Sequence, residues 1–597
     1  MRINHVWISG YRNIKKTDFG INNKLILIGE NNSGKSNVLK AITSPLSPGG
    51  EGYYTQPMTL RDVNDEEKNS YYKYIKENFD QLMKENSEVI AQTEFLSYIP
   101  KVKIRLQFDV DDDSRFYFEK LITEDTEGNI VYQLEFQYQI DDPTKLLDHL
   151  KNVKRIASND DEELSRIQVN LLPEDLYKSH LIVPGKNDTV SYDLSKNLKY
   201  YSLIAERDGF STSRSKMGSS AIIKLLNRNI DDQSKISIEQ GYNTFFDEVK
   251  DSTKMDEVFN WAKYASNYKN AQEFFGEISI LPNMPPMNSL LNSVQLGYAE
   301  EPLAQQGLGY RNLVYLSAMV NALERDDETP FAVLSIEEPE AHLSNENQKL
   351  LISFLNSSSE SANNFQLMYS THNTNFLPKL ALENVVIMSE GKATSFKTEM
   401  NAEDLNYLIR NPNLDVYKLF FSTNVILVEG LSEELLIKSY LRSKKDSLNN
   451  IEVLSFHKGF CAIIRLWLKI NINNRRKLAV IRDFDNQPRA KGKIEKLARK
   501  NKISINTTNG YTLEDDIVKN NFEILRPFFK NHLDWPDDVC QDKQKLAKYW
   551  ENASGAKGAA MAEISLAINT PELENFRLPE HIMQAINFFK DTTNENN

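Results

Sequence analysis

The stretch Gly29-Glu-Asn-Asn-Ser-Gly-Lys-Ser36 decides the fold of this chain. It follows Leu25-Ile-Leu-Ile28, a short apolar run that predicts a buried strand, and it precedes residues 37–42, which predict the start of a helix. A strand, a glycine loop and a helix in this order are the context that the G-x-x-x-x-G-K-[ST] motif requires. The sequence therefore predicts a P-loop that binds ATP with Mg²⁺.

Each residue type in this loop has a physical role. Glycines let backbone amides close around the phosphates, the lysine reaches the β- and γ-phosphates, and the hydroxyl of Ser36 ligates magnesium. The predicted ATP-binding residues are Gly29, Asn31, Asn32, Gly34, Lys35, Ser36 and Asn37.

A second apolar run, within residues 331–343, ends in two carboxylates. Glu337 is expected to hold magnesium through water, and Glu338 to orient the attacking water. Glutamate replaces the aspartate usual at the first position, which puts the hydrolysis rate in question. His372 ends a further predicted strand; it is either a structural histidine or, as we favour, a sensor of the γ-phosphate.

Gly307 and Gly309 lie in a turn before an apolar helix, where ABC-type ATPases carry their signature segment. The helix N-terminus of that segment binds the nucleotide held by the opposite subunit. A simple glycine-capped helix start is the alternative. The signature interpretation predicts ATP between two subunits, and hence a homodimer or a dimer of dimers.

The C-terminal half carries a second set of carboxylates. The stretch Asn424-Val-Ile-Leu-Val-Glu-Gly430 predicts a strand that ends in the carboxylate of Glu429 and a glycine, and Asp483 and Asp485 end another predicted strand that starts at Leu478. The carboxyl ends of parallel strands converge on one crevice, so these groups are expected to meet. Crowded carboxylates repel unless divalent cations neutralise them, and hard oxygen ligands favour Mg²⁺ or Mn²⁺.

Together these strands match the Toprim pattern, a glutamate on one strand and Asp-x-Asp on a later one. Glu514 and Asp516 supply further carboxylates for a second metal ion, and Lys557 can stabilise the charge on a cleaved phosphate. The basic run 489–502 follows directly; on its own it is a solvated helix face, but beside a metal site it predicts DNA contact. The expected DNA-binding residues are Arg489, Lys491, Lys493 and Lys496.

Composition limits the possible classes of protein. The net charge of −13 argues against a protein that coats nucleic acid with its whole surface. Two distant cysteines, Cys461 and Cys540, cannot build a disulfide framework or a four-thiolate zinc site. Without an apolar run of about eighteen residues, no membrane span is expected. A cytoplasmic, fully folded α/β multidomain protein is the prediction.

The motifs suggest five regions along the chain. They are the first part of an ABC/SMC-like P-loop ATPase with antiparallel strands (1–144), a helical insert for dimerisation (145–295), the second part of the ATPase (296–415), a Toprim parallel α/β domain (416–530) and a small helical C-terminal region that completes the nuclease site (531–597).

The order of these motifs resembles the OLD (overcoming lysogenization defect) family. The resemblance includes an N-terminal Tyr-Arg-Asn, the P-loop, Ile336-Glu-Glu-Pro-Glu-Ala-His-Leu343, a Ser-Thr-His strand end and Leu427-Val-Glu-Gly-Leu-Ser-Glu433. It covers residues 1–60 and 300–565. Residues 513–517 and Lys557 resemble the class 2 arrangement of Gabija nuclease subunits. The family often has a glycine-rich loop between the two Toprim strands, and this chain has Ser455-Phe-His-Lys-Gly-Phe460 there. This segment is either a surface loop or a loop in which His457 and Lys458 approach the phosphate.

The resemblance implies cutting of DNA at two metal ions in anti-phage defence. Ligand or acid/base roles are implied for the carboxylates, with Lys557 assisting: Glu429, Glu433, Asp483, Asp485, Glu514 and Asp516. Partners implied are a UvrD-like helicase, as in Gabija, or a reverse transcriptase with its DNA-RNA hybrid, as in retrons. We expect ATP to inhibit cleavage.

Alternatives come from other classes. An SMC- or RecF-like DNA-binding ATPase in DNA repair would use the Toprim domain as a non-catalytic platform, but a platform needs no full carboxylate set. A topoisomerase needs a tyrosine nucleophile on a breakage domain, and a bacterial primase needs a cysteine-rich zinc module. Both of these are disfavoured.

Overall fold

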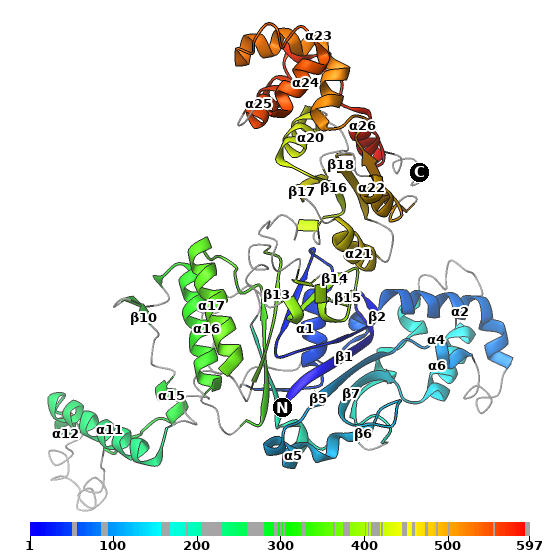
Figure 1. Cartoon of the computed structure of the whole chain (residues 1–597). Coiled ribbons are helices and arrows are strands. Elements are labelled where there is room, and N and C mark those ends of the chain that lie inside the picture. Colours follow the sequence, from blue (N-terminus) through cyan, green and yellow to red (C-terminus); the bar gives the residue numbers. More distant parts are fainter. Residues whose placement is uncertain are drawn as a thin grey trace, which may run out of the picture.

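The computed structural model has a mixed α/β architecture built on three principal sheets (Figure 1). None of the described helices combines the length and the hydropathy that a membrane span requires. The structure describes residues 1–49, 57–84, 94–156, 167–186, 189–203, 230–258, 280–291, 297–298, 301–302, 305–324, 329–361, 365–373, 382–399, 402–403, 405–406, 418–419, 422–443, 450–456, 460–471, 476–484, 488–499, 502–552 and 556–590.

The first sheet is antiparallel, in the order β2-β1-β5-β7-β6, with β8 paired to β7. Its β5 strand alternates buried and partly exposed residues, as expected for strands that cover a core on one face. The antiparallel strands predicted for the first region, residues 1–144, are therefore confirmed. The bounds are β1 Arg2–Tyr11, β2 Ile14–Gly20, β5 Val102–Asp109, β6 Ile122–Glu124, β7 Ile130–Ile140 and β8 Tyr177–Ile182.

The second sheet contains the P-loop strand, in the order β15-β14-β3-β13-β12-β9-β4. Strands β3 and β13 are buried along their whole length, which explains their continuous apolar sequences. Both run parallel to each other, so their carboxyl ends share one edge. The bounds are β3 Leu25–Gly29, β4 Ser47–Pro48, β9 Leu198–Leu203, β12 Phe331–Glu337, β13 Phe365–Thr371, β14 Val385–Ser389 and β15 Lys392–Ser395.

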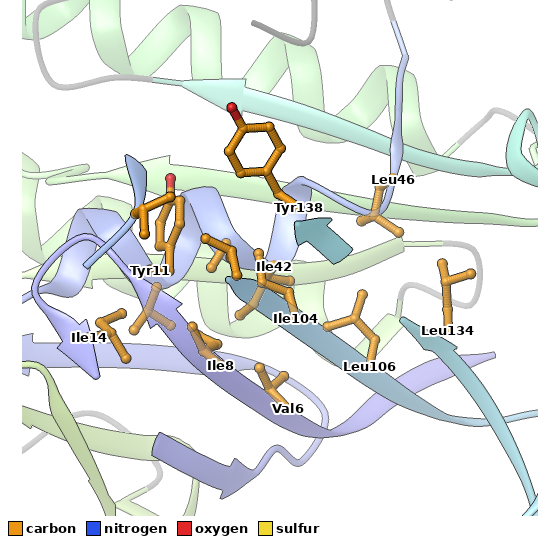
Figure 2. Packing of buried hydrophobic residues seen from close by; sticks show 14 of the residues in the cluster. Val6, Ile8, Tyr11, Ile14, Ile42, Leu46, Ile104, Leu106, Leu134 and Tyr138 are labelled. Carbon is orange, nitrogen blue, oxygen red and sulfur yellow. The ribbon is translucent and has the colours of Figure 1, made fainter. Parts of the chain in front are cut away.

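One apolar core joins these two sheets around helix α1 (Lys35–Thr43). Figure 2 shows Ile42 and Leu46, from α1 and the segment after it, near Ile104 and Leu106 of the antiparallel sheet. The P-loop helix is thereby fixed on both sides.

The expected helical insert at 145–295 is only partly helical. Strand β8 extends the antiparallel sheet, and β9 pairs in parallel with β12 in the P-loop sheet. The sequence of β9 is short and mixed in polarity, and its pairing partner lies far along the chain, so no local pattern predicted it. The described helix α11 (Asp232–Ser252) has no buried residue. Within the expected insert, residues 204–229 and 259–279 lie outside the described residues.

The structure also gives this half shorter elements and further helices outside the two sheets. They are α2 Asp65–Lys84, α4 Phe95–Tyr98, α5 Asp112–Phe118, α6 Pro143–Ile156, α8 Gln168–Leu171, α9 Tyr192–Ser195, α12 Met255–Val258, α15 Met287–Leu291, β10 Gly297–Tyr298, β11 Glu301–Pro302, α16 Leu308–Glu324, α17 Asn345–Ser361 and α18 Phe396–Glu399.

The third sheet is fully parallel, in the order β17-β16-β18-β19. Helices α23, α24 and α25 gather at its end of the molecule, and α26 packs on β18 and β19 (Figure 1). The bounds are β16 Asn424–Val428, α20 Leu431–Ser443, β17 Ile451–Ser455, α21 Phe460–Ile470, β18 Lys477–Arg482, α22 Pro488–Glu495, β19 Ile503–Thr507, α23 Leu513–Leu533, α24 Lys543–Asn552, α25 Ala556–Ala567 and α26 Glu580–Asn587.

The parallel sheet and the P-loop sheet share one apolar cluster. Ile28 and Ile387 of the P-loop sheet belong to the same buried cluster as Leu427 and Val480 of the parallel sheet. An ion pair also joins the two parts: the guanidinium of Arg476, just before β18, lies 3.3 Å from the carboxylate of Glu30 in the P-loop.

Candidate nucleotide and metal sites

The P-loop glycines occupy conformations that other residues rarely adopt. Gly29 has φ of 151° and Gly34 has φ of 110°. A Cβ at Gly29 would lie 2.3 Å from the carbonyl oxygen of Met388 on the neighbouring strand. Both glycines are therefore required by the turn and by close packing.

Lys35 is buried, and its ammonium donates to the carbonyl oxygens of Gly29 at 2.7 Å and Glu30 at 2.8 Å. Burial lowers the pKa of Lys35, while the charges of Glu338, Glu340 and Glu30 act in the opposite direction. These carbonyl contacts keep the lysine within the loop that is predicted to enclose phosphate.

Ser36 and Glu337 meet at the carboxyl edge of the P-loop sheet. The Ser36 hydroxyl donates to Glu337 Oε2 at 2.8 Å, although the two residues are distant in sequence. A hydroxyl and a carboxylate side by side suit Mg²⁺, which prefers hard oxygen ligands. The pair expected to hold the magnesium of ATP is thus brought together.

Glu338 lies beside His372, with the carboxylate 3.2 Å from Nδ1 of the imidazole. The backbone of Glu338 has φ of 45°, and its N–H donates to the carbonyl of Ser370. Glu340, which the sequence did not single out, also faces the histidine at 3.9 Å and accepts a hydrogen bond from Thr371. Burial raises the pKa of Glu340.

The asparagines of the P-loop have different surroundings. Asn37 donates to Asn13 at 2.9 Å and accepts from Arg12 at 3.0 Å, so the N-terminal Tyr-Arg-Asn turn supports the P-loop helix. Asn13 also donates to the carbonyl of Asn32. Asn31 is exposed.

Gly307 and Gly309 lie at the start of α16. A Cβ at Gly309 would lie 2.5 Å from the carbonyl oxygen of His342, so this glycine has a packing role within the chain. Around Gly307, a Cβ would meet nothing within 4 Å among the described residues. The role of this segment toward a second subunit stays a prediction.

The carboxyl ends of the parallel strands bring several predicted residues to one edge. Glu429 follows β16, Asp483 follows β18, and Glu433 lies in the first turn of α20. A Cβ at Gly430 would lie 3.0 Å from Glu433 Oε2, so the side chain of Glu433 lies directly against this turn.

Lys557 lies near three carboxylates, those of Glu514, Asp483 and Glu433. Its ammonium is 2.8 Å from Glu514, which is only 1% exposed. Burial lowers the pKa of Lys557, but the hydrogen bond to Glu514 and the charges of Glu514, Asp483 and Glu433 raise it more. Burial also raises the pKa of Glu433, and the charge of Glu514 acts in the same direction. Lys557 and Glu514 therefore form an ion pair at a place where burial disfavours charged side chains.

Arg482 is a buried cation next to the same edge, and the sequence reading missed it. Its Nε lies 3.9 Å from Glu429 and donates to the carbonyl oxygen of Asp483 at 3.1 Å. Its buried Nη1 has no hydrogen-bond partner among the described residues. As the last residue of an apolar strand, Arg482 had only its unusual charge to single it out.

Asp516 has a different position from the one expected of a metal ligand. Its oxygens accept from the backbone N–H groups of Asn509 at 2.9 Å and Gly510 at 2.8 Å, and His581 lies 3.3 Å away. Burial raises the pKa of Asp516, but these hydrogen bonds lower it more. The carboxylate of Asp516 therefore holds the loop that leads into α23.

The donor set fits a divalent cation in part. Glu514 Oε2 is buried and accepts no hydrogen bond from the described residues, as an oxygen reserved for a cation would be. No three acidic, imidazole or thiol groups in the described part of the chain lie close enough to hold a metal by themselves. The predicted ligand Asp485 lies outside the described residues, as do His457 and Lys458.

The predicted DNA-binding residues lie on and just after α22, which follows the Asp483 segment. Arg489, Lys493 and Lys496 are exposed. Lys491 lies 5.7 Å from the ring of Phe484 and 3.8 Å from Glu495. This helix thus presents cations close to the carboxylate edge.

Glu434 is a further residue that the sequence reading missed. It accepts from the N–H of Ser455 at 3.1 Å and pairs with Lys438, so it ties α20 to the end of β17. The charges that act on adjacent Glu433 are instead those of Glu514 and Lys557. Neighbouring glutamates on one helix turn cannot be distinguished by sequence pattern alone.

Comparison with known proteins identifies both halves. Residues 1–377 match the AAA ATPase domain, and residues 420–485 match the Toprim domain of overcoming lysogenization defect-like proteins. A curated relative, endonuclease GajA of Bacillus cereus (strain HuB5-5), is 26% identical over 276 residues, which are 38% of this chain and 40% of GajA. The chain thus matches less than half the length of this relative.

Two solved structures show distant likenesses to this chain. The SMC head domain from Thermotoga maritima is 14% identical and covers 66% of this chain and 98% of its own, with a TM-score of 0.28. The C-terminal region of the Burkholderia pseudomallei OLD protein is 18% identical and covers 29% and 98%, with a TM-score of 0.23. At TM-scores this low, neither likeness assigns a fold or a function to this chain.

The family assignment rests on the matched segments and their order. The AAA ATPase match spans more than half of the chain, and an OLD-like Toprim segment follows it. The chain therefore belongs to the AAA ATPase-domain family and, with its Toprim segment, to the OLD family that its motifs resemble.

Proposed function

We propose that this chain is a nucleotide-regulated, metal-dependent DNA endonuclease. The observation that carries the proposal is the grouping of Glu433, Glu514 and Lys557 beside Asp483, at the carboxyl edge of a parallel sheet. A non-catalytic platform has no use for buried acidic groups around a lysine, because their burial costs free energy. The name of the relative, endonuclease GajA, supports the same activity.

The carboxylates that would hold Mg²⁺ or Mn²⁺ are Glu429, Glu433, Asp483 and Glu514, with Asp485 as the further expected ligand. Bound magnesium ions, two in the arrangement that the family implies, would polarise the phosphodiester and activate water. Lys557 would stabilise negative charge on the cleaved phosphate. We assign Asp516 to holding the loop rather than to ligation, because its oxygens already accept two backbone N–H groups.

DNA would approach along α22. The exposed Arg489, Lys493 and Lys496 can contact phosphates, and such contacts make binding weaker at higher salt concentration. They supply locally the positive charge that an acidic protein lacks as a whole.

The ATPase half would regulate the cut. Ser36, Glu337, Glu338 and His372 form a nucleotide site, and the Arg476–Glu30 ion pair gives it a direct contact with β18. We propose that ATP binds between two copies of the chain and inhibits cleavage. A role in anti-phage defence, alone or with a UvrD-like helicase or a reverse transcriptase, completes the proposal.

Cleavage of supercoiled plasmid tests the endonuclease activity. Wild type with Mg²⁺ is expected to give nicked or linear DNA, EDTA to stop the reaction, and Asp483→Ala to lower the rate by about 10²-fold or more. The matched control is Asp538→Ala, which changes an exposed aspartate in the same half. Equal rates for wild type and Asp483→Ala, or no cleavage by either, would sink the proposal.

A further inference from the structure

Thr508 lies directly after β19 and makes two hydrogen bonds to the strand that ends at the acidic edge. Its N–H donates to the carbonyl of Arg482 at 3.0 Å, and its hydroxyl oxygen accepts from the N–H of Phe484 at 2.9 Å. The same hydroxyl donates to the carbonyl of Gly510 at 3.2 Å. Thr508 is 5% exposed, so water does not compete freely for these bonds.

These bonds enclose Asp483. The residue before it and the residue after it are both held by Thr508, and its own carbonyl accepts from the side chain of Arg482. The regular pairing of β18 with β19 ends at Arg482 and Thr507. Beyond that point, the Thr508 hydroxyl takes the place of a backbone acceptor and extends the pairing past Asp483.

The loop behind Thr508 is itself anchored. Asp516 accepts the N–H groups of Asn509 and Gly510, and His581 of α26 lies 3.3 Å from the same carboxylate. Asp516 is 4% exposed and His581 is 2% exposed. A chain of buried polar contacts therefore runs from α23 and α26 through Thr508 to the backbone of Asp483.

We propose that Thr508 is a positioning residue that fixes the Asp483 backbone so that its carboxylate meets a divalent cation. The proposal rests on the proposed function of this edge. Partners that orient a metal ligand typically change metal affinity or activity by about 10–100-fold when they are removed. The hydroxyl is the group that matters, because valine has nearly the same shape and cannot accept the N–H of Phe484.

The test compares Thr508→Val with Thr508→Ser, which keeps the hydroxyl, and with Thr507→Val, the same change one residue earlier. Binding of Mn²⁺ alone is measured by titration calorimetry, and plasmid cleavage is measured against Mg²⁺ concentration. Thr508→Val is expected to weaken Mn²⁺ binding by about 10-fold or more and to raise the half-saturating Mg²⁺ concentration similarly. Thr508→Ser is expected to stay within about threefold of wild type, as is Thr507→Val.

Two outcomes overturn the positioning role: metal affinity of Thr508→Val equal to that of wild type, or a loss that Thr508→Ser shares in full. If Thr508→Val does not fold, Gly510→Ala carries the test, because its Cβ would lie 3.0 Å from Asp516 Oδ1 and disturb the same loop. Unchanged Mn²⁺ binding by folded Gly510→Ala then overturns it. Wild type that binds Mn²⁺ but cuts no DNA refutes the nuclease proposal alone.

Discussion

Replacing Lys557 by methionine separates the structural role of this lysine from its role in cleavage. The ammonium lies 2.8 Å from Glu514, which is 1% exposed. At an effective dielectric constant of about 20, the gross attraction at this distance is about 6 kcal/mol. Desolvation offsets much of it, and Lys557 keeps 42% of its side-chain exposure. We therefore expect a net loss of about 2 kcal/mol, below the ~3–5 kcal/mol typical of a fully buried pair.

Thermal unfolding and plasmid cleavage measure the two effects. A loss of about 2 kcal/mol lowers the melting temperature of a domain of roughly 150–250 residues, the size range of the C-terminal half, by about 4–8 °C. Cleavage is expected to fall by about 10²–10³-fold, the usual effect of removing one group that stabilises developing charge. Lys548→Met, an exposed lysine on the neighbouring α24, is the matched control and should change neither.

A second substitution distinguishes the two roles. In Glu514→Gln/Lys557→Met, Glu514 is no longer a buried charge that has lost its partner, so part of the melting temperature is expected to return while cleavage stays low. Wild-type melting and wild-type cleavage in Lys557→Met would refute the reasoning. Melting that falls equally in the single and double variants would refute the ion-pair account alone.

Three further predictions concern Glu433, Arg476 and Glu338. Burial raises the pKa of Glu433, so the stability it contributes is present below its unfolded pKa and is lost as pH rises through its folded pKa. In EDTA, Glu433→Gln should therefore lose less melting temperature than wild type between about pH 5 and about pH 8; parallel curves would contradict this. Arg476→Gln breaks the contact with Glu30 and should keep magnesium-dependent cleavage while its inhibition by ATP weakens; an unchanged ATP titration would count against coupling. Glu338→Gln should lower phosphate release from ATP by about 10²-fold or more while nucleotide binding persists, and wild-type turnover would remove Glu338 from hydrolysis.

Much of the fold could be predicted because its buried parallel strands have continuous apolar sequences. The P-loop, the strand that ends at Glu337 and the strands that end at Glu429 and Asp483 all follow this rule. The polar residue that ends each strand was visible for the same reason. Strand β9 escaped prediction because its six mixed residues become a strand only by pairing with β12.

The candidate site was predicted less completely. Residue type could suggest carboxylates, but it could not tell which oxygens the chain uses for its own backbone. Asp516 holds the amides of Asn509 and Gly510, whereas Glu514, two residues earlier, faces Lys557. The contacts of Thr508 and Arg482 depend on tertiary packing between separate elements, so no spacing in the sequence announces them.

The apolar cluster that joins the P-loop sheet to the parallel sheet limits how the chain can be divided. Leu427 and Val480 are fully buried in the same cluster as Ile28 and Ile387. In a fragment that begins near residue 420, the apolar side chains of this cluster would be exposed to solvent. Aggregation through that surface would then mask any catalytic activity. The two halves must consequently evolve together, because a substitution in the shared cluster on one side limits the residues tolerated on the other. A chimera that takes its halves from two relatives would need both sides of this cluster from the same relative.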